Sequence, residues 1–326
     1  MKVIITGGTG LIGVELTKRL ARDGDEVVIL SRSSGKPDTL PDEARVVQWD
    51  SRTGDGWNHE LENTDILINL AGSNLSGGRW TESRKRLILE SRVNAGNAVI
   101  DGIRSSGYVP KQVIQASGVA IYGHREDGFQ DESAPPGDDF LASVCIDWEK
   151  STAPVEEMGA RRVIIRSGPV LNIGDGALPP IAMPFHLFLG GRTGSGAQGL
   201  PWIHLEDEVE AIRFLMANED VEGPVNLCAP EPVSNQQFAE AIGRVMNRPS
   251  IFPVPGVVLR TLLGEVADTV LLGQYAIPKR LTDAGYEFRF PNIDSALSDL
   301  IGEESRMPGS RLFRRGASAA FRMLLP

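Results

Sequence analysis

Two hydrophobic periodicities alternate along the first half of the chain. Short apolar runs typical of buried strands are followed by longer stretches in which apolar residues recur at helical spacing. The strand-like runs are residues 3–6, 27–30, 46–49, 65–70, 112–115 and 162–166, and the helical stretches are 11–20, 82–103 and 140–157. Strands that alternate with helices form a parallel sheet covered on both faces. We therefore predict an α/β fold with a doubly wound parallel sheet.

The pattern changes after Leu171. Residues 172–200 are rich in Gly and Pro, so we expect the chain to leave the sheet there. The elements predicted beyond this point are an extended segment at 202–205, a helix at 206–217, a strand at 224–228 and a helix capped by Ser234. Residues 250–300 alternate short apolar segments with prolines. These features predict a smaller second lobe beside the sheet.

A glycine-rich turn joins the first predicted strand to the first predicted helix. It reads Gly7-Gly8-Thr9-Gly10-Leu11-Ile12-Gly13, and a second strand follows at the spacing of a βαβ unit. In such a turn one glycine permits the tight bend, one lets the backbone approach a pyrophosphate, and one lets the helix pack on the strand. The free N–H groups of the first helical turn add the positive end of the helix dipole. We therefore predict a dinucleotide site that contains Gly7, Thr9, Gly10, Leu11, Ile12 and Gly13.

The end of the second strand indicates which dinucleotide binds. NAD sites usually place Asp or Glu there for the ribose 2′-hydroxyl, whereas NADP sites supply Arg for the 2′-phosphate. Here the strand ends in Ser31-Arg32, and Asp23, Asp25 and Glu26 come before it. A guanidinium matches phosphate geometry, so Ser31 and Arg32 favour NADP(H) over NAD(H). The alternative is that Arg32 is a solvated surface cation.

Further cofactor candidates stand at the ends of the other strands. Ligands of open parallel sheets bind at the carboxyl ends of the strands. The residues that follow the later strand-like runs are therefore expected to border the same ligand. They are Asp50, Leu70, Ala71, Gly72, Ser117, Gly168 and Pro169.

Charge and composition exclude several other classes of protein. The 326 residues include 33 basic and 43 acidic side chains, and the net charge of −10 disfavours nonspecific nucleic-acid binding. A local basic pocket for a phosphorylated ligand stays open. The two cysteines and four histidines show no ligand spacing, so we expect neither a disulfide framework nor a metal site.

The start of the chain and its most apolar stretch bear on location. The first predicted strand begins at residue 2, so we expect no signal peptide. The most apolar stretch, residues 178–189, is short and is interrupted by prolines, so it does not read as a transmembrane segment. We expect a cytoplasmic protein.

An ordered series of short motifs runs through about residues 1–300. Beyond the glycine turn, the motifs are Asn69-Leu70-Ala71-Gly72, Arg79-Trp80-Thr81, Ser91-Arg92-Val93, Ser117…Tyr122-Gly123, Cys145…Trp148-Glu149, Arg166–Leu171, Gly190-Gly191, Gly196, Gln198, Pro201–His204…Asp207 and Pro278–Leu281…Gly285-Tyr286. In this series the chain resembles the NADP-binding epimerase family of the extended short-chain dehydrogenase/reductase superfamily. The resemblance implies a Rossmann domain that binds NADP(H), and a second lobe that binds a small hydroxylated or nucleotide-linked substrate.

The resemblance and the change of composition together predict the domain boundaries. A Rossmann domain is expected to contain the glycine turn, and a C-terminal lobe to contain the substrate-binding residues. The predicted divisions are residues 1–171 plus about 202–230 for the Rossmann domain, about 172–201 plus 231–300 for the substrate lobe, and 301–326 for a basic tail.

The superfamily's catalytic pair, Tyr-x-x-x-Lys, is absent from the helix where the resemblance places it. Alignment on the Trp-Glu pair of that helix puts Leu141 at the Tyr position and Cys145 at the Lys position. Leucine carries no proton and a buried thiol is a weak donor, so neither can perform the original proton transfer. Ser117 and Tyr122 are the remaining catalytic candidates. Cys145 either lines the nicotinamide pocket or packs as a small apolar residue.

Three residues near the expected cleft are each open to two interpretations. Tyr122 could lend its hydroxyl to catalysis or shape the substrate-side wall. For His204, a hydrogen-bonded structural role is favoured over that of a general base. Asp207 is expected to cap or brace the helix that follows His204.

Irregular segments around the expected cleft supply the substrate-binding candidates, because binding residues collect on loops held by a rigid scaffold. An arginine pair with an aromatic side chain would suit a phosphorylated or nucleotide-linked ligand. Anchoring of the loops is the equally weighted alternative. The candidates are Arg79, Trp80, Arg192, Gln198 and Trp202.

The tail at residues 307–326 combines basic and large apolar side chains. Such a segment can make weak contact with an anionic membrane surface. A helix docked on its own protein, or a frayed end, is the favoured alternative. The oligomeric state is not predicted.

Two functions from different classes follow from these features. The complete cofactor motif predicts an NADP(H)-dependent oxidoreductase or nucleotide-sugar epimerase-like protein. The missing Tyr and Lys favour the alternative, an NADP(H)-binding redox sensor or interaction module without turnover.

Overall fold

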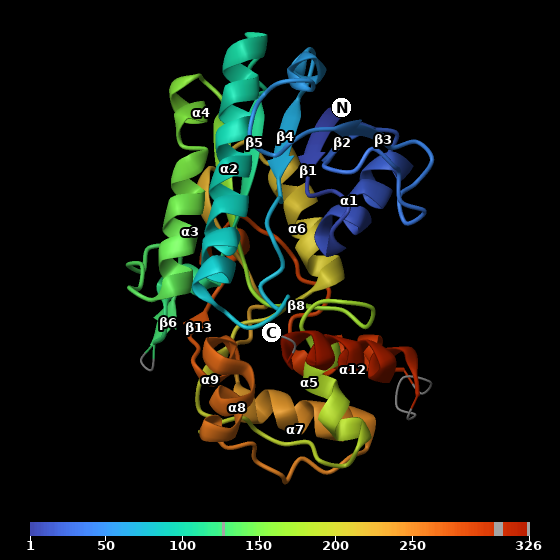
Figure 1. Cartoon of the computed structure of the whole chain (residues 1–326), viewed down its shortest axis with the longest axis vertical. Helices are drawn as coiled ribbons and strands as arrows, with labels where there is room; N and C mark the ends of the chain where they lie inside the picture. The colour runs from blue at the N-terminus through green and yellow to red at the C-terminus, as the bar shows by residue number, and fades with distance from the viewer. Residues whose placement is uncertain (126–127, 303–308, 325–326) are drawn as a thin grey trace.

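The structure, a computed structural model, describes residues 1–125, 128–302 and 309–324, and it describes side chains up to residue 318. Figure 1 shows two lobes stacked along the long axis of the molecule. The sheet and its covering helices form one lobe, and a group of helices forms the other. In the described ranges, no helix combines the length and the apolar character needed to cross a membrane.

Seven parallel strands form the central sheet in the order β11-β7-β5-β4-β1-β2-β3. From β1 the chain winds outward in one direction through β2 and β3, and in the other through β4, β5, β7 and β11. This topology confirms the predicted doubly wound α/β fold. The strands are β1 (Lys2–Thr6), β2 (Glu26–Ser31), β3 (Arg45–Gln48), β4 (Ile66–Asn69), β5 (Gln112–Gly118), β7 (Arg161–Ser167) and β11 (Gly223–Leu227).

Helices cover both faces of the sheet because alternate strand residues point to opposite sides. Val3 and Ile5 of β1 pack in one core with α1 and α6, whereas Ile4 packs in another core with α2. Figure 1 shows α3 lying along α2 on this second side. The helices are α1 (Leu11–Arg22), α2 (Glu82–Ser106), α3 (Phe140–Ser151), α4 (Pro154–Glu157) and α6 (Leu205–Ala217).

The helix predicted over 140–157 is in fact two helices, α3 and α4. Pro154 has no N–H to donate to a carbonyl of the preceding turn. The chain therefore leaves α3 at Thr152, and Pro154 stands at the start of α4, where a missing N–H is tolerated.

The second lobe has its own core, to which Phe185, Trp202, Phe238 and Leu297 contribute. Ser234 caps α7 as predicted, in a capping box with Gln237. The remaining helices are α5 (Leu178–His186), α7 (Asn235–Met246), α8 (Gly256–Leu263), α9 (Asp268–Leu271), α10 (Lys279–Asp283), α11 (Ile293–Leu300) and α12 (Arg311–Leu324), with 3-10 turns η1 (Asn58–Leu61), η2 (Val119–Tyr122) and η3 (Gly264–Ala267). The short strands are β6 (Phe129–Gln130), β8 (Val170–Leu171), β9 (Gly199–Leu200), β10 (Ile203–His204), β12 (Val233–Ser234) and β13 (Tyr275–Ala276).

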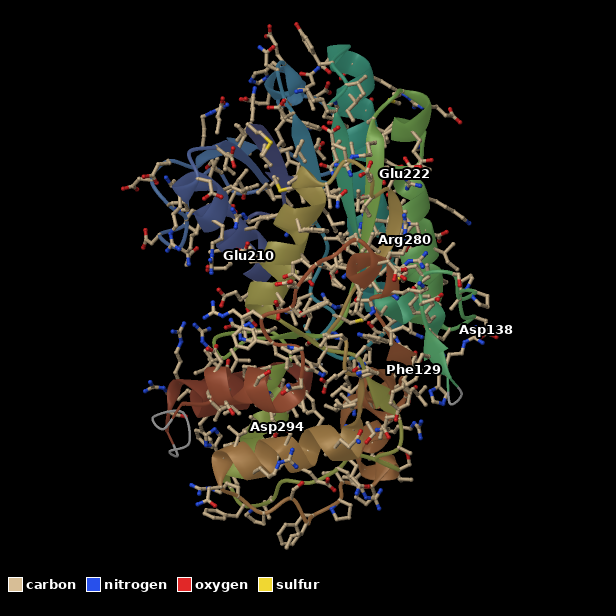
Figure 2. All side chains as sticks on the ribbon, turned by 180° about the vertical axis from the view of Figure 1, so that it is seen from behind. Phe129, Asp138, Glu210, Glu222, Arg280 and Asp294 are labelled. Carbon is tan, nitrogen blue, oxygen red and sulfur yellow. The ribbon has the colours of Figure 1, made fainter. Side chains whose placement is uncertain are left out.

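One part of the predicted substrate lobe packs on the sheet instead. Leu281, Tyr286 and Phe288 pack on the core beneath α1 and α6. Arg280 donates a hydrogen bond to the carbonyl of Pro224 in β11, and Figure 2 shows it beside the sheet lobe. The apolar side chains of 281–288 complete the sheet core, which a prediction from composition could not reveal. The domain boundaries themselves stay a prediction.

The C-terminal helix α12 lies against α5 (Figure 1). Leu312 is fully buried, and the rings of Phe313 and His186 are 5.4 Å apart. A Cβ at Gly316 would lie 2.2 Å from the carbonyl oxygen of Pro179, so the two helices approach closely at that glycine. Helix α12 therefore docks on its own protein, which is one of the two interpretations favoured for the tail. Met307 and the side chains of 319–326 lie outside the described residues.

Candidate functional site

The turn between β1 and α1 requires glycine at two positions. Gly7 has a φ of +69°, and a Cβ there would lie 2.7 Å from the carbonyl carbon of Leu70. A Cβ at Gly13 would lie 2.6 Å from the carbonyl oxygen of Gly7. Side chains at these positions would push apart the turn, α1 and the end of β4.

Gly10 differs from its neighbours because the protein leaves space around it. It caps α1 at an ordinary φ of −84°, and no side chain caps the helix. The nearest protein atom to an added Cβ would be the carbonyl oxygen of Gly7, at 3.3 Å. The first N–H groups of α1, from Leu11 to Gly13, therefore stand without a side-chain cap, and Thr9 and Gly10 are exposed beside them. This arrangement fits an anion such as a pyrophosphate.

The end of β2 presents a free cation. Arg32 is exposed, and its guanidinium makes no hydrogen bond or ion pair with the part of the chain that the structure describes. The Ser31 hydroxyl oxygen accepts a hydrogen bond from the N–H of Ser33 at 3.2 Å. Asp50, at the end of β3, accepts hydrogen bonds from the N–H groups of Arg52 and Thr53, so its carboxylate closes its own turn.

The strand ends that follow β1 lie in one row. The register places Thr6 beside Asn69, and Asn69 beside Gln115. Their side chains are linked, since the Thr6 hydroxyl donates to Asn69 Oδ1 and Asn69 Nδ2 donates to Gln115 Oε1 at 2.8 Å. The structure thus brings the predicted cofactor candidates at four strand ends to one edge of the sheet. They are Gly7, Leu70, Ala71, Gly72, Ser117, Gly168 and Pro169.

Both catalytic candidates belong to one buried network. Ser117 Oγ donates to Glu149 Oε1 at 2.7 Å, and Glu149 holds Arg166 through two hydrogen bonds of 2.9 and 3.0 Å. Arg166 Nη1 donates to the Tyr122 hydroxyl at 3.1 Å, and that hydroxyl donates to Asn226 Oδ1 at 2.7 Å. Burial opposes charge on Arg166, but the Glu149 carboxylate raises the pKa of its guanidinium above the usual value.

Tyr122 and Cys145 are not poised for proton transfer near neutral pH. Burial raises the pKa of Tyr122 to about 12, and its side chain is fully enclosed. Burial likewise raises the pKa of the Cys145 thiol to about 11. Cys145 lies in α3, packed with Val119 and Ile121, which agrees with a small apolar role. Neither group matches the pKa that efficient general acid–base catalysis needs.

The hydrogen-bonding groups of four substrate candidates contact the protein itself. Arg79 donates to the carbonyls of Thr261 and Leu262 in α8, and so joins the two lobes. Trp80 donates to the carbonyl of Leu75, and Arg192 to those of Gly194 and Ser195. Gln198 donates to the carbonyls of Thr193 and Val270. These contacts favour loop anchoring, the alternative interpretation.

Trp202 stands apart from the other candidates. Its side chain is 1% exposed and lies in the core of the second lobe. It therefore has no surface for a ligand in this conformation.

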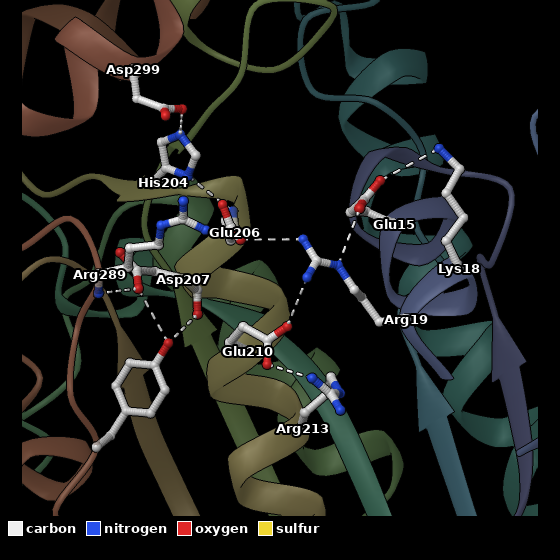
Figure 3. Close-up of polar contacts among 11 residues, drawn as sticks. Glu15, Lys18, Arg19, His204, Glu206, Asp207, Glu210, Arg213, Arg289 and Asp299 are labelled. Carbon is white, nitrogen blue, oxygen red and sulfur yellow. Dashed lines mark hydrogen bonds and ion pairs between the residues drawn. The ribbon is translucent and has the colours of Figure 1, made fainter. Parts of the chain in front are cut away.

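His204 and Asp207 stabilise the junction of α6 with the C-terminal segment (Figure 3). The N–H of Glu206 donates to His204 Nδ1, and His204 Nε2 lies 3.3 Å from the Asp299 carboxylate. The Asp207 carboxylate accepts hydrogen bonds from the N–H groups of Arg289 and Phe290. Burial lowers the pKa of His204. His204 is thus the N-cap of α6, and Asp207 braces the helix without capping it.

Figure 3 also shows how charged side chains join α1 to α6. Arg19 of α1 lies 3.3 Å from Glu206 and 3.5 Å from Glu210, and it also pairs with Glu15. These contacts hold the helix that follows the glycine turn against the sheet lobe.

Sequence reasoning missed Arg92 as a candidate in its own right. Its side chain is 8% exposed, its Nη1 donates to the carbonyl of Ile88, and the guanidinium carbon lies 4.9 Å from the centre of the Trp148 ring. A Cβ at Gly72 would lie 3.1 Å from that same carbon. A signal was present, because Arg92 occupies a position of the apolar stripe of α2, which also contains Ile88, Ala95 and Val99.

Sequence reasoning also missed Glu208 of α6. Its carboxyl is fully buried, and Ser167 Oγ donates to Glu208 Oε1 at 2.6 Å. Glu208 Oε2 has no hydrogen-bond partner in the described ranges. Burial raises the pKa of Glu208 to about 8, so this carboxyl is protonated at neutral pH. Among the described residues, no group of His, Cys, Asp and Glu side chains is arranged to hold a metal ion.

Comparisons with known proteins place this geometry in context. The sequence model of the NAD dependent epimerase/dehydratase family matches residues 3–143, and a domain of unknown function, DUF1731, matches residues 254–300. The epimerase family protein YfhF of Bacillus subtilis is 41% identical over 304 residues, which are 93% of this chain and 99% of YfhF.

Solved structures show the same similarity. The crystal structure of the human epimerase family protein SDR39U1 with NADPH has 32% identity and a TM-score of 0.80, over 92% of this chain and 99% of that one. The UDP-glucose 4-epimerase of Thermus thermophilus, solved with NAD, has 18% identity and a TM-score of 0.73, over 93% of this chain and 100% of that one. The second comparison shows a shared fold.

Proposed function

The chain belongs to the epimerase family, and from that premise we propose that it is an NADP(H)-binding protein that acts on a small hydroxylated or nucleotide-linked substrate. The observation that carries the proposal is the turn from Gly7 to Gly13. Its two obligatory glycines form a cradle, and the uncapped first turn of α1 faces that cradle. A phosphate of the cofactor would satisfy those N–H groups.

Each part of the cofactor has matching residues along the edge of the sheet. The pyrophosphate would lie on Thr9, Gly10 and the N–H groups of Leu11–Gly13. The nicotinamide end would extend toward the strand ends at Gly72, Ser117 and Gly168. When bound, the nicotinamide would supply a hydride donor or acceptor, and the protein would bind, orient and shield it.

The exposed end of β2 would select NADP over NAD by binding the 2′-phosphate. The guanidinium of Arg32 has no partner among the described residues, and Ser31 and Ser33 supply polar groups beside it. No carboxylate follows β2 directly, so the ribose 2′-hydroxyl of NAD would lack its usual acceptor there. The human relative, solved with NADPH, agrees with this preference.

A second candidate function is NADP(H) binding without turnover, as a redox sensor or interaction module. The enclosed Tyr122 hydroxyl and the high pKa values of Tyr122 and Cys145 favour it. Position 141 holds a leucine, so α3 offers no proton there. Any hydride transfer would then depend on Ser117 or on water for its proton.

Titration of the purified protein with NADPH and NADH, followed by turnover assays, tests the proposal. Carbonyl compounds and nucleotide sugars would be supplied with NADPH, and its oxidation measured by absorbance. Oxidation above that of a Gly10→Val variant supports the enzyme. Tight NADPH binding without NADPH oxidation in the presence of any of these compounds supports the second candidate. Failure of the native protein to bind either cofactor would overturn both.

A further inference from the structure

Arg92 is a buried cation with no counterion among the described residues. It is 8% exposed, yet it makes no ion pair with a carboxylate in the residues that the structure describes. Of the five N–H groups of its guanidinium, only one on Nη1 has a hydrogen-bond partner there, the carbonyl of Ile88 at 3.0 Å. Burial lowers its pKa to about 10. A desolvated charge of this kind is costly unless another group pairs with it.

The surroundings of Arg92 fix where the guanidinium points. The Trp148 ring of α3 lies on one side, 4.9 Å from the guanidinium carbon. The backbone of Gly72, just beyond the end of β4, lies on another side. A Cβ at Gly72 would come within 3.1–3.3 Å of three Arg92 side-chain atoms, so a glycine at this strand end leaves room for the arginine.

Arg92 lies near the α3 position at which the family resemblance places the lysine of the catalytic pair. Cys145, which the family resemblance places at that position, lies close enough to Arg92 that its thiolate form would raise the pKa of the guanidinium. Trp148, which contacts Arg92, lies one helical turn beyond Cys145 on α3. A positive charge is therefore present beside the site, although it comes from α2 and not from α3.

We propose that Arg92 binds the nicotinamide riboside half of NADP(H), and so takes over the cofactor-positioning role of the absent lysine. The proposal rests on the proposed function, because it requires that NADP(H) lies along the edge of the sheet. Ribose hydroxyl and phosphate oxygens are acceptors for the Arg92 N–H groups that have no partner among the described residues. In this role Arg92 positions the cofactor and does not transfer a proton.

Binding measurements with two ligands test the proposal. NADPH contains the nicotinamide riboside, and 2′,5′-ADP contains only the adenosine half with the 2′-phosphate. We expect Arg92→Met to weaken NADPH binding about tenfold or more, since charge-assisted hydrogen bonds are lost. Binding of 2′,5′-ADP should stay within about twofold of the native value. Arg92→Lys, which keeps the charge, should recover part of the NADPH affinity.

The stability of the ligand-free protein gives a readout that separates binding from folding. Methionine matches the apolar stem of Arg92 and removes an unpaired buried charge, so the melting temperature of Arg92→Met should equal or exceed the native one. Arg86→Met, an exposed change on the same helix, is the matched control and should alter neither binding nor melting.

The outcomes that contradict the proposal are distinct. Unchanged NADPH affinity in Arg92→Met overturns it, and so does an equal loss of NADPH and 2′,5′-ADP affinity, because that would show a general structural role. If Arg92→Met melts well below the native protein, the test is made with Arg92→Lys instead. An equal loss of affinity for NADPH and 2′,5′-ADP in Arg92→Lys would overturn the inference. Failure of the native chain to bind 2′,5′-ADP would overturn the proposed function itself.

Discussion

The glycine turn and the α3 side, the two halves of the candidate cofactor site, differ in how much of the family's motif they retain. The glycine turn retains every feature of its motif, and its geometry depends on backbone atoms of Gly7, Gly13 and Leu70. On the α3 side, the family resemblance predicts that Leu141 and Cys145 replace the Tyr and Lys of the catalytic pair. The hydroxyls of Ser117 and Tyr122 instead donate to Glu149 and Asn226 within the fold.

The difference indicates that cofactor binding and proton transfer would depend on different parts of this fold. A pyrophosphate needs a shape and free N–H groups, which the turn provides. Proton transfer needs a side chain with a suitable pKa in contact with the substrate. The polar groups on the α3 side, such as Ser117 and Tyr122, form hydrogen bonds within the fold. A variant in each half should therefore affect a different property.

The largest expected effect is the loss of cofactor binding in Gly10→Val. The side chain would fill the space in which the pyrophosphate approaches the backbone, and binding should fall below detection. Folding should persist because Gly10 has an ordinary φ and an added Cβ would approach one backbone atom, the carbonyl oxygen of Gly7, at 3.3 Å, which a small shift of the turn relieves. NADPH fluorescence titration and thermal melting measure the two properties.

Two further glycine variants complete this test. Gly13→Val should unfold the protein, since its side chain would meet the backbone of Gly7 and Gly8. Gly302→Val, at an exposed glycine where no atom of the described residues lies within 4 Å of an added Cβ, should change neither property. Near-native NADPH affinity in Gly10→Val would place the phosphate elsewhere.

Glu149→Gln should destabilise the fold on the α3 side. It removes the negative partner of the buried Arg166, and one-sided loss of a buried pair costs about 3–5 kcal/mol. NADPH binding to the folded fraction should change little. Urea unfolding measures the loss, with Glu156→Gln as control, because the Glu156 side chain is 53% exposed and an ion pair with an exposed partner is worth about 1 kcal/mol or less. Equal effects of the two changes would show that the buried network does not support the fold.

Stability should also depend on pH through Glu208. Its pKa is raised to about 8 in the folded protein, so between its ordinary value and pH 8 the folded state holds a proton that the unfolded state releases. The contribution of Glu208 to folding is therefore most favourable at acidic pH and weakens as pH rises to 8, by at most about 1.4 kcal/mol per pH unit. Glu208→Gln should flatten urea-unfolding stability between pH 5 and 8, whereas the exposed change Glu240→Gln should not. An unchanged slope in Glu208→Gln would contradict this assignment.

Arg32→Ala tests the adenosine end of the site. NADPH should bind more tightly than NADH to the native protein, and the variant should narrow that difference by about 1.5–3 kcal/mol, the value of a charge-assisted contact. Parallel titrations with both cofactors measure it, and Arg104→Ala, an exposed arginine in the last turn of α2, is the control. Equal affinities of the native protein for the two cofactors would refute the NADP preference.

Cys145→Ala should have the smallest effect. The thiol is buried and its pKa is raised to about 11, so little thiolate forms at neutral pH. NADPH affinity should stay nearly constant, and any activity should remain within about tenfold, or about 1.4 kcal/mol in the barrier. Cys228→Ala, at another buried thiol, is the control. Turnover that disappears only in Cys145→Ala, with the circular dichroism spectrum unchanged, would show a catalytic thiol.

Local patterns in the sequence predicted the main elements well. Apolar runs placed the sheet strands, because a strand buried on both faces needs such a run. Gly7, Gly10 and Gly13 predicted the turn at the start of α1, and Ser234 the start of α7, because both depend on neighbours in the chain. The interruption at Pro154 was missed, since the helical periodicity continues through it.

The roles of single polar residues were less predictable. Arg79, Arg192 and Gln198 looked suited to a ligand, yet their partners are carbonyls that approach them only in the folded chain. Trp202 gave no sequence sign of its burial in the second core. The assignment of cofactor-binding residues remains a prediction, because it concerns contacts with a ligand.

The sequence by itself determined the periodicity of the strands, the glycine turn and the absence of Tyr and Lys at their usual positions, because each is a property of residues close together in the chain. Only the tertiary structure decided that Glu149 pairs with Arg166, that Glu208 is buried beside Ser167, and that Arg92 stands unpaired beside Gly72. Those features depend on which strand end meets which helix, and the energy of a charge depends on what surrounds it in space.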